Sequence, residues 1–352
     1  MLTVWMTGAH ELAGLSGSAA LIVGAVLIAG LSSVSAGHNE QAVASTPTKT
    51  VSAARASADI RVDRDLTYET TNCAGRGLEA EKADLYLPAA RPLGHPTPLV
   101  ILIHGGSFVK GSRLIDDFPR VASELATLGW AAASIDYCLP PMGVAGYPDE
   151  VNEAESAVGY FESRASEYQL DPHRFVLWGA SAGATLAVDS TTLLDRANSL
   201  PVVAAVGWSG AYQLGAASDV RAPIQSIVSN YLGCAATVPS CRATYDQASA
   251  VTHVTRYSPP MYLANSTDEL MPLDQLVAMH RALAAAGVRV QTQIIPGRLH
   301  AMAYTDAAFC PTVAFLATYL GPTNTACAVP PAVAIGASKL HAHSSRKGTG
   351  RV

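Results

Sequence analysis

The sequence predicts an α/β fold in which a mostly parallel central sheet is flanked by helices. Short apolar segments alternate with longer segments whose apolar residues recur at every third or fourth position, and Gly, Asp or Pro bound most of the short segments. Short strands that are apolar on both faces are typical of a buried parallel sheet. Regular alternation of strands with helices places helices on both faces of such a sheet. The length of 352 residues suits one large domain of this class or two smaller ones.

The individual elements follow from these patterns. The strands are expected at residues 98–103, 129–135, 174–178, 202–208, 260–264 and 288–295, and the helices at 117–128, 149–167, 184–194 and 272–286. Pro272 suits the start of the last of these helices, and Gly287 suits its end. Residues 212–256 contain no clear strand. They are predicted to form a helical excursion above the sheet that supplies a lid or wall for a binding pocket.

The N-terminal segment, residues 1–36, is predicted to be a signal peptide or a retained membrane anchor. Residues 12–36 carry no charge and include a dense apolar stretch of the length found in signal peptides, followed by small residues that suit cleavage before Gly37. Residues 1–11 contain no Lys or Arg, which a signal peptide would have. The predicted location is therefore export, either secreted or attached to the membrane or cell envelope, and the alternative is a buried or unstructured segment.

Composition divides the rest of the chain. Residues 37–60 are small and polar and are predicted to form a flexible stalk. Residues 61–329 are predicted to form the folded domain that carries the chemistry, and residues 330–352 a disordered basic tail. The formal net charge is -5, from 23 basic and 28 acidic residues. Because there is no basic excess, no nucleic-acid partner is predicted.

The cysteines are predicted to form disulfides. The six are Cys73, Cys138, Cys234, Cys241, Cys310 and Cys327. There is no Cys-x-x-Cys pair and no His/Cys cluster with zinc spacing, so no metal site is expected. An even number in an exported chain indicates disulfides, and nearness in sequence favours Cys234–Cys241 and Cys310–Cys327, which leaves Cys73 with Cys138. The alternative is that some are free, buried cysteines.

The segment GASAG at residues 179–183 is the first candidate for chemistry. It follows the apolar strand RFVLW and precedes the helical segment ATLAVDSTTLL. A serine on a sharp strand-to-helix turn is the arrangement of a nucleophile elbow, in which flanking glycines avoid clashes. The motif alone also occurs in ordinary turns where small residues allow close packing. Ser181 is therefore a candidate nucleophile that needs a base and an orienting acid elsewhere in the chain.

The candidate base and acid follow later strands. His300 is the histidine that lies directly after a predicted strand, in a loop shaped by Pro and Gly, and it is assigned as the base. Asp268 follows the preceding strand and is assigned as the orienting acid; Glu269 and Asp274 are the alternatives. Both loops are at the carboxyl ends of strands, where open α/β sheets build their sites.

A candidate oxyanion hole lies upstream. The segment VILIHGGSFVKG at residues 100–111 is an apolar strand that ends in His-Gly-Gly. Adjacent glycines let backbone N–H groups approach a substrate oxygen. The N–H groups of Gly105, Gly106 and Ala182 are assigned to this role, and the alternative for the glycines is an ordinary tight turn.

These segments together resemble the bacterial esterase/lipase branch related to hormone-sensitive lipase. The resemblance covers about residues 80–320 and rests on VILIHGGSFVKG, SIDYCLPP, FVLWGASAGATLA, YSPPMYLANSTDELMP and IIPGRLHAM. It implies an α/β-hydrolase fold, no cofactor and hydrolysis of small carboxylic esters, usually with short acyl chains. Three differences from the family pattern are Ser107 in place of a third glycine, Cys138 in place of arginine, and GASAGA without an acidic residue before the serine and with Ala184 in place of glycine.

The sequence leaves two other functions as alternatives. A serine peptidase or amidase of the same fold would usually carry a large additional domain, and no such domain fits in this chain. A non-catalytic binding protein on a hydrolase scaffold would usually lack the serine or the histidine. Because Ser181, the acidic loop and His300 occur in the order found in α/β hydrolases, the sequence favours an esterase.

Overall fold

The structure is a computed structural model that describes residues 60–89, 95–196, 201–215, 222–324 and 326–327. The predicted signal peptide or anchor at 1–36, the stalk up to residue 59 and the basic tail at 330–352 lie outside the described residues. Ile60, which was assigned to the stalk, begins the first strand of the folded domain.

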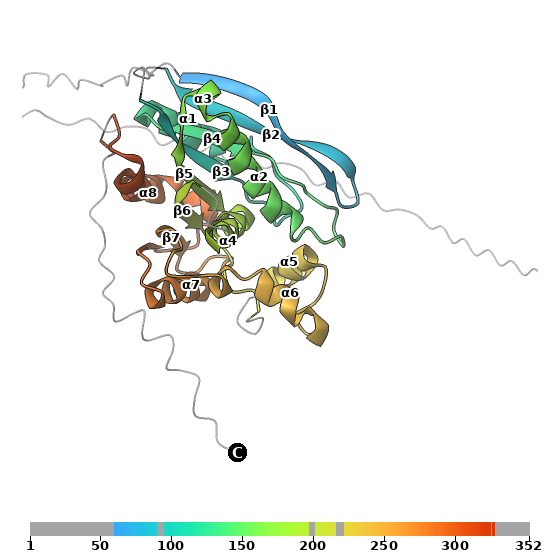
Figure 1. Cartoon of the computed structure of the whole chain (residues 1–352). Coiled ribbons are helices and arrows are strands. Elements are labelled where there is room, and N and C mark those ends of the chain that lie inside the picture. Colours follow the sequence, from blue (N-terminus) through green and yellow to red (C-terminus); the bar gives the residue numbers. More distant parts are fainter. Residues whose placement is uncertain (1–59, 90–94, 197–200, 216–221, 325, 328–352) are drawn as a thin grey trace, which may run out of the picture. The chain divides into compact units, whose positions relative to one another are not determined.

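The central sheet has eight strands in the order β1-β2-β4-β3-β5-β6-β7-β8 (Figure 1). The strands are β1 (Ile60–Cys73), β2 (Gly77–Pro88), β3 (Thr97–Ile103), β4 (Ala131–Ile135), β5 (Leu170–Ala180), β6 (Val202–Trp208), β7 (Met261–Ser266) and β8 (Val290–Ile295). β1 and β2 pair antiparallel, and β2 pairs antiparallel with β4. The other neighbours are parallel, so the predicted mostly parallel sheet is confirmed.

The six predicted strands correspond to β3–β8, and the hairpin β1–β2 was missed. β1 has mixed burial along its length and carries charged or polar residues at most positions. It is held by pairing with β2 at eleven register positions, interrupted by two irregularities. Because its stability comes from that partner more than from its own apolar residues, the sequence pattern of an isolated strand is weak.

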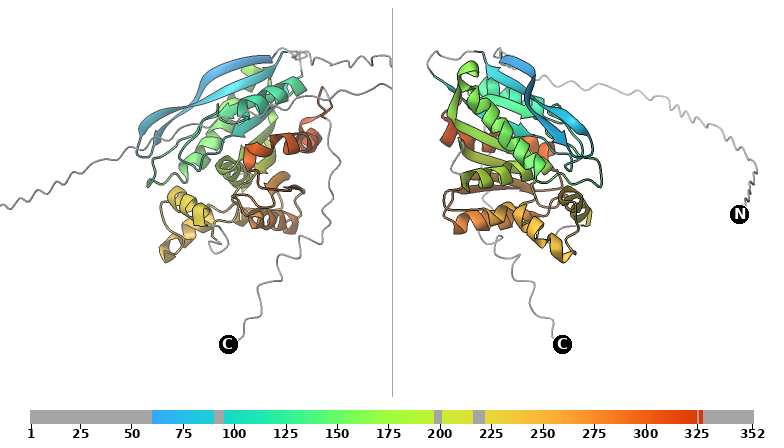
Figure 2. Two further views of the ribbon diagram at one scale, coloured as in Figure 1. Left: turned by 180° about the vertical axis from the view of Figure 1, so that it is seen from behind. Right: turned by 45° about the vertical axis from the view of Figure 1, so that its right-hand side comes forward.

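Helices cover both faces of the sheet (Figure 2). The main ones are α1 (Phe118–Leu128), α2 (Asp149–Ser163), α3 (Ala165–Tyr168), α4 (Ala182–Arg196), α7 (Leu273–Ala285) and α8 (Thr305–Leu320). The predicted helix at 149–167 is divided into α2 and α3 at Arg164, whose backbone leaves the helical region. α8 was not predicted.

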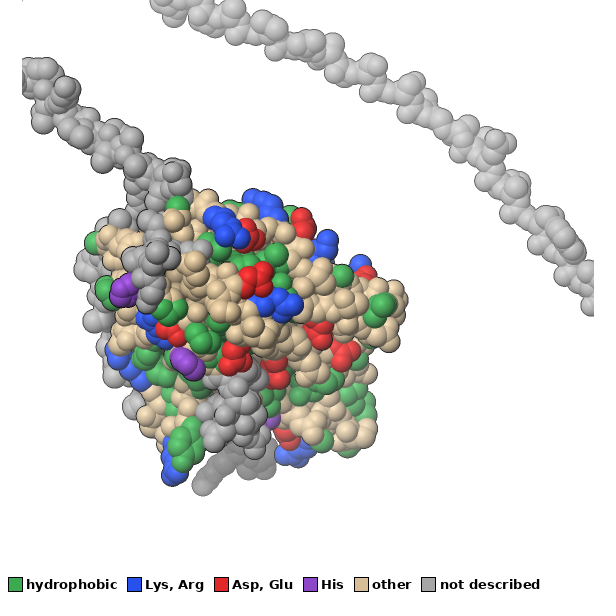
Figure 3. Space-filling model, turned by 45° about the horizontal axis from the view of Figure 1, so that its top comes forward, with side chains coloured by type: hydrophobic (Ala, Val, Ile, Leu, Met, Phe, Trp, Pro, Cys, Tyr) green, Lys and Arg blue, Asp and Glu red, His purple; other side chains and the backbone are tan. Residues whose placement is uncertain are grey.

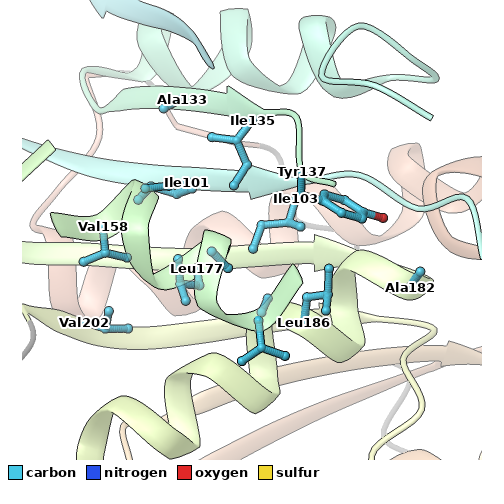
Figure 4. Packing of buried hydrophobic residues seen from close by; sticks show 14 of the residues in the cluster. Ile101, Ile103, Ala133, Ile135, Tyr137, Val158, Leu177, Ala182, Leu186 and Val202 are labelled. Carbon is cyan, nitrogen blue, oxygen red and sulfur yellow. The ribbon is translucent and has the colours of Figure 1, made fainter. Parts of the chain in front are cut away.

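The core has one layer on each side of the sheet. Ile101 and Ile103 of β3 pack with α2 and α4 in one cluster, part of which is drawn in Figure 4. Val100 and Leu102, which alternate with them, pack with α1 and α8 in another cluster. A strand that contributes to both cores must be apolar at every position. This explains the uninterrupted apolar run from Leu99 to Ile103 of β3, in which every side chain is buried.

Residues 212–256 form the predicted helical excursion between β6 and β7, as far as they are described. It contains α5 (Ala222–Leu232), α6 (Arg242–Gln247) and two short 3-10 turns, Pro239–Cys241 and Ala250–Thr252. Val228 and Tyr231 of α5 are buried in the same cluster as β3. The side chain of Tyr231 stacks on Phe108, which follows the His-Gly-Gly segment, with ring centroids 3.9 Å apart.

The three predicted disulfides are all present. Cys73–Cys138, Cys234–Cys241 and Cys310–Cys327 are bonded, with Cα–Cα distances of 5.4, 6.1 and 5.4 Å. Cys73–Cys138 joins the end of β1 to the segment after β4, and so connects the edge hairpin to the parallel part of the sheet. None of the six cysteines is free. Among the described helices, none is long and apolar enough to cross a membrane.

We expect removal of the disulfide at Cys73–Cys138 to lower the free energy of unfolding by about 2–4 kcal/mol, because the cross-link restricts the unfolded chain. The measurement is urea unfolding of the Cys73→Ala/Cys138→Ala double variant beside the wild type. Thiol titration of the denatured, unreduced wild type is the control and should find no free thiol. A full complement of free thiols would contradict the disulfide assignment.

Two acids are buried without partners between α2, α4 and α5. Among the described residues, the carboxyl oxygens of Glu150 and Asp189 have no hydrogen-bond partner, and both side chains are buried. Burial raises the pKa of Glu150 to about 9 and that of Asp189 to about 8. At neutral pH both carboxyl groups are therefore protonated in the folded protein, whereas an unfolded chain ionises them near pH 4.

This difference in pKa makes stability depend on pH. Between about pH 4 and pH 9 the folded state retains the Glu150 proton and the unfolded state loses it. The free energy of unfolding therefore falls as pH rises, by about 1.4 kcal/mol per pH unit for one group. Glu150→Gln should remove this contribution and stabilise the protein more at pH 8 than at pH 5. Urea unfolding at both values measures it, with Glu162→Gln on the same helix as the control. An equal effect of Glu150→Gln at the two pH values would contradict the assignment.

Candidate functional site

Ser181 lies on a sharp turn between β5 and α4, as the GASAG motif predicts. Its φ is 56°, a left-handed value that costs energy for a residue with a side chain. A Cβ on Gly179 would lie 1.9 Å from the carbonyl oxygen of Gly183, and a Cβ on Gly183 would lie 2.0 Å from the carbonyl oxygen of Ile103. Both positions therefore require glycine, and the turn is packed directly against the end of β3.

The structure brings His300 to Ser181. His300 lies in the loop between β8 and the short turn Ala301–Tyr304. Its Nε2 is 2.9 Å from Ser181 Oγ, within hydrogen-bond distance, although the residues are 119 positions apart in sequence. The histidine side chain is partly exposed, so a molecule in solution can approach it. This geometry suits transfer of a proton from the serine hydroxyl to the imidazole.

The carboxylate that contacts His300 is Glu269, which corrects the assignment of Asp268. Glu269 Oε2 is hydrogen-bonded to His300 Nδ1, and its side chain is fully buried. Asp268 is half exposed and its Oδ2 accepts a hydrogen bond from Arg298 Nε at 2.8 Å. With one ring nitrogen on Ser181 and the other on Glu269, the imidazole has no nitrogen left for Asp268. The other alternative, Asp274, is exposed on the first turn of α7.

The Glu269 carboxylate is itself held in place. Its Oε1 accepts hydrogen bonds from Ser209 Oγ at 2.9 Å and from the backbone N–H of Ser266 at 2.6 Å. Ser209 Oγ also accepts the backbone N–H of Ala301, next to His300, at 2.9 Å. Ser209 therefore connects the acid with the histidine loop, and the hydrogen bonds that it and Ser266 make keep the buried carboxylate from being unsatisfied.

Sequence reasoning missed Ser209 and Tyr304. Tyr304 is buried and its hydroxyl lies 2.8 Å from Ser209 Oγ and 3.1 Å from the carbonyl oxygen of Ala264. Ser209 directly follows the strand β6 and has φ 58°, so its position resembles that of Ser181 after β5. A polar residue at the carboxyl end of a buried parallel strand was the signal that could have indicated it.

The His-Gly-Gly segment forms a tight loop beside Ser181. Gly106 has φ 129°, and a Cβ there would lie 1.7 Å from the carbonyl oxygen of Lys110. Gly105 is close to the elbow, because a Cβ on it would lie 3.1 Å from Ser181 Cβ. Ala182 begins α4, where the first backbone N–H groups of a helix have no partner within the helix. Of the three predicted oxyanion donors, Gly105 and Ala182 are therefore neighbours of Ser181, and Gly106 lines the same cavity as Ser181.

His104 supports this loop and does not face the site. It is completely buried, its Nδ1 lies 2.6 Å from the carbonyl oxygen of Gly105, and its ring stacks on Tyr137 with centroids 4.3 Å apart. Burial lowers the pKa of His104, so its imidazole is neutral at pH 7. A Cβ on Gly111 would lie 2.4 Å from His104 Nδ1, which shows how closely the loop wraps around the ring.

A cavity of about 490 Å³ opens beside Ser181 and His300. It is lined by Gly105, Gly106, Ser107, Asp116, Asp117, Ala180, Ser181, Leu270, His300, Ala301, Met302 and Ala303. None of these belongs to residues 212–256, so the described part of the excursion does not supply the wall that was predicted. Ser107, at the position where the resembled family has a third glycine, lines the cavity with φ 58°.

Within the described ranges, no group of three or more His, Cys, Asp or Glu side chains could hold a metal ion. The face of the molecule in Figure 3 carries acidic and basic side chains interspersed with small hydrophobic areas. A concentrated basic surface, which nucleic-acid binding would need, is not a feature of this view.

The sheet order, the serine on its elbow and the serine–histidine–carboxylate contacts define an α/β hydrolase fold with a hydrolase-like site. Comparison with known proteins agrees with this class. The chain belongs to the BD-FAE family, whose model matches residues 83–283.

Two relatives of this chain have curated names that describe ester hydrolases. The chain is 25% identical over 225 residues to the probable carboxylic ester hydrolase LipM of Mycobacterium tuberculosis, covering 61% of this chain and 52% of the relative. It is 31% identical over 228 residues to an acetyl esterase of Salmonella schwarzengrund, covering 58% and 66%. The chain thus spans between half and about two thirds of the length of these relatives.

Solved structures share the fold. A truncated carbohydrate esterase from gut microbiota has a TM-score of 0.59 at 18% identity, covering 74% of this chain and 96% of the other. A bacterial heroin esterase has a TM-score of 0.57 at 23% identity, covering 75% and 83%. These similarities confirm the α/β-hydrolase fold that the resemblance to the esterase/lipase branch implied.

Proposed function

We propose that this protein is a serine carboxylesterase that hydrolyses short-chain carboxylic esters through an acyl-enzyme intermediate. The observation that carries the proposal is the continuous hydrogen-bonded line from Ser181 through His300 to Glu269 at the edge of a cavity of about 490 Å³. The esterase names of the relatives support the reaction class, and the acetyl esterase name supports a short acyl group.

In the first step, the Ser181 hydroxyl attacks the ester carbonyl carbon while His300 Nε2 takes its proton. The Glu269 carboxylate accepts a hydrogen bond from Nδ1–H, which fixes the tautomer that leaves Nε2 free to accept a proton. Because the Glu269 carboxylate is buried in direct contact with His300 Nδ1, it also stabilises the imidazolium that forms. The protonated His300 then gives its proton to the departing alcohol.

The negative charge that develops on the carbonyl oxygen is stabilised by the backbone N–H groups of Gly105, Gly106 and Ala182. Each such donor contributes about 3 kcal/mol in enzymes of this type. In the second step, His300 takes a proton from the water that attacks the acyl-serine. It then gives this proton to Ser181 Oγ as the acid leaves, which restores the serine hydroxyl and the neutral imidazole. No step requires a cofactor.

Two further proposals concern the setting of the enzyme. The three disulfides support export, because such bonds persist in oxidising compartments. The uncharged segment at residues 12–36, as a signal peptide or an anchor, would deliver the protein to the cell envelope or beyond.

The test is hydrolysis of p-nitrophenyl esters, from acetate to palmitate, by the wild type and by Ser181→Ala. We expect activity that is highest for short chains and that Ser181→Ala reduces by about a thousandfold or more. Activity on anilides but not on esters would favour the alternative of a peptidase or amidase. Folded wild-type protein without activity on either would favour a binding role and would contradict the proposal.

A further inference from the structure

We propose that Asp116 makes this site prefer esters that carry a cationic group over uncharged esters of the same shape. This inference rests on the proposed esterase function and adds the charge of the substrate to it. The observations that carry it are the position of Asp116 on the cavity wall, its lack of a partner and the charges around it.

Asp116 lines the same cavity as Ser181 and His300. It is exposed, and within the described residues no hydrogen bond or ion pair is made by its carboxylate. Its φ is 53°, a left-handed value that Asp tolerates better than most residues but that still costs energy. The loop therefore presents to the site an exposed carboxylate that has no partner among the described residues.

The neighbouring charges do not neutralise it. Asp117, also on the cavity wall, pairs with Arg120 at 2.7 Å, and this contact lowers the pKa of Asp117. The same guanidinium also contacts Glu124 at 3.0 Å and Asp306 at 3.3 Å. One positive charge is thus shared by three carboxylates, which leaves this side of the cavity with an excess of negative charge.

The remaining cavity wall adds no positive side chain. Among the residues that line the cavity, there is no Lys or Arg. His300 is hydrogen-bonded to the Glu269 carboxylate, so the positive charge of a protonated His300 would be balanced by the negative charge of Glu269. Leu270 and Met302 supply apolar surface that suits the methyl groups of a quaternary ammonium ion. The cavity thus combines an uncompensated carboxylate, which attracts a cation, with apolar surface that alkyl groups on that cation can contact.

The expected effect is moderate because the carboxylate is exposed. An ion pair at a distance of about 5–7 Å in a strongly hydrated site contributes about 0.6–0.8 kcal/mol, which corresponds to about threefold to fourfold in kcat/KM. The preference should shrink as salt is added, because salt screens interactions between exposed charges.

The experiment compares matched esters with the wild type, Asp116→Asn and a control variant. With the charge on the alcohol, the pair is acetylcholine, which is the acetate ester of choline, and 3,3-dimethylbutyl acetate. With the charge on the acid, the pair is ethyl 4-(trimethylammonio)butanoate and ethyl 5,5-dimethylhexanoate. Asp246→Asn is the control, because it removes the same charge from α6, away from the cavity lining. The readout is the cationic-to-neutral ratio of kcat/KM, and dividing the wild-type ratio by the variant ratio cancels the intrinsic reactivity of each ester.

We expect the ratio to fall about threefold or more in Asp116→Asn for at least one pair, with little change in Asp246→Asn and with the neutral esters hydrolysed normally. If both ratios are the same in the wild type and Asp116→Asn while the neutral esters are hydrolysed in a Ser181-dependent manner, the charge preference is wrong and the esterase proposal stands. If no ester is hydrolysed by the wild type, both proposals fail together.

Discussion

Glu269→Gln is expected to reduce kcat/KM for a short p-nitrophenyl ester by about 10²–10⁴-fold, whereas Asp268→Asn should leave it within about threefold. In Glu269→Gln, the amide can donate a hydrogen bond to His300 Nδ1, which places the proton on the nitrogen that faces Ser181 and removes the base. Asp268 instead pairs with Arg298, and both side chains are in contact with solvent. Loss of the Asp268 charge therefore affects this ion pair and not His300. Exposed ion pairs contribute little to stability.

The two variants are matched, because each replaces a carboxylate by its amide on neighbouring residues of one loop. Thermal unfolding of both should be recorded, so that a loss of activity is separated from a loss of structure. A large loss in Asp268→Asn together with normal activity in Glu269→Gln would reverse the assignment and restore Asp268 as the orienting acid.

Gly183→Ala is expected to lower kcat by about 100-fold or more, or to prevent folding. The new Cβ would lie 2.0 Å from the carbonyl oxygen of Ile103 and 2.5 Å from that of His104. Both are backbone atoms of the strand and loop that carry the oxyanion donors, so neither can move aside cheaply. A displacement of the nucleophile by about 1 Å costs a factor of this size.

The control for this variant is Gly159→Ala on α2. A Cβ at Gly159 has no neighbour within 4 Å, so this change should leave kcat unchanged and stabilise the helix by about 1 kcal/mol. The measurements are kcat with a short ester and urea unfolding for both variants. Normal activity and stability in Gly183→Ala would contradict the packing of the elbow against β3.

The parallel part of the fold could be predicted because its strands are buried on both faces. β6 was predicted with its observed bounds, 202–208, and β3 within one residue. The hairpin β1–β2 could not be predicted in the same way, since β1 is an edge strand whose side chains are mostly polar or partly exposed. The missing signal was the pairing itself, which joins Cys73 to Gly77 across a short turn.

The site residues that could be predicted are those whose place at the end of a strand or the start of a helix is visible in the sequence. Ser181 has a strand before it, a helix after it and glycines on both sides, and His300 follows the last strand. The choice between Asp268 and Glu269 depends on which side chain the loop turns inward. That choice depends on contacts with Ser209 and Ser266, and Ser209 comes from a different loop. A pattern of residue types within one loop does not contain this information.

The most direct test of the proposed serine esterase is covalent labelling with diethyl p-nitrophenyl phosphate. An activated serine attacks the phosphorus and releases p-nitrophenol, so the account predicts one equivalent of p-nitrophenol for each protein molecule, complete loss of esterase activity, and a diethylphosphoryl group on the peptide that contains Ser181. His300→Ala should react much more slowly, since it lacks the base. Full esterase activity after treatment, or a stoichiometric label on a different residue, would contradict the account.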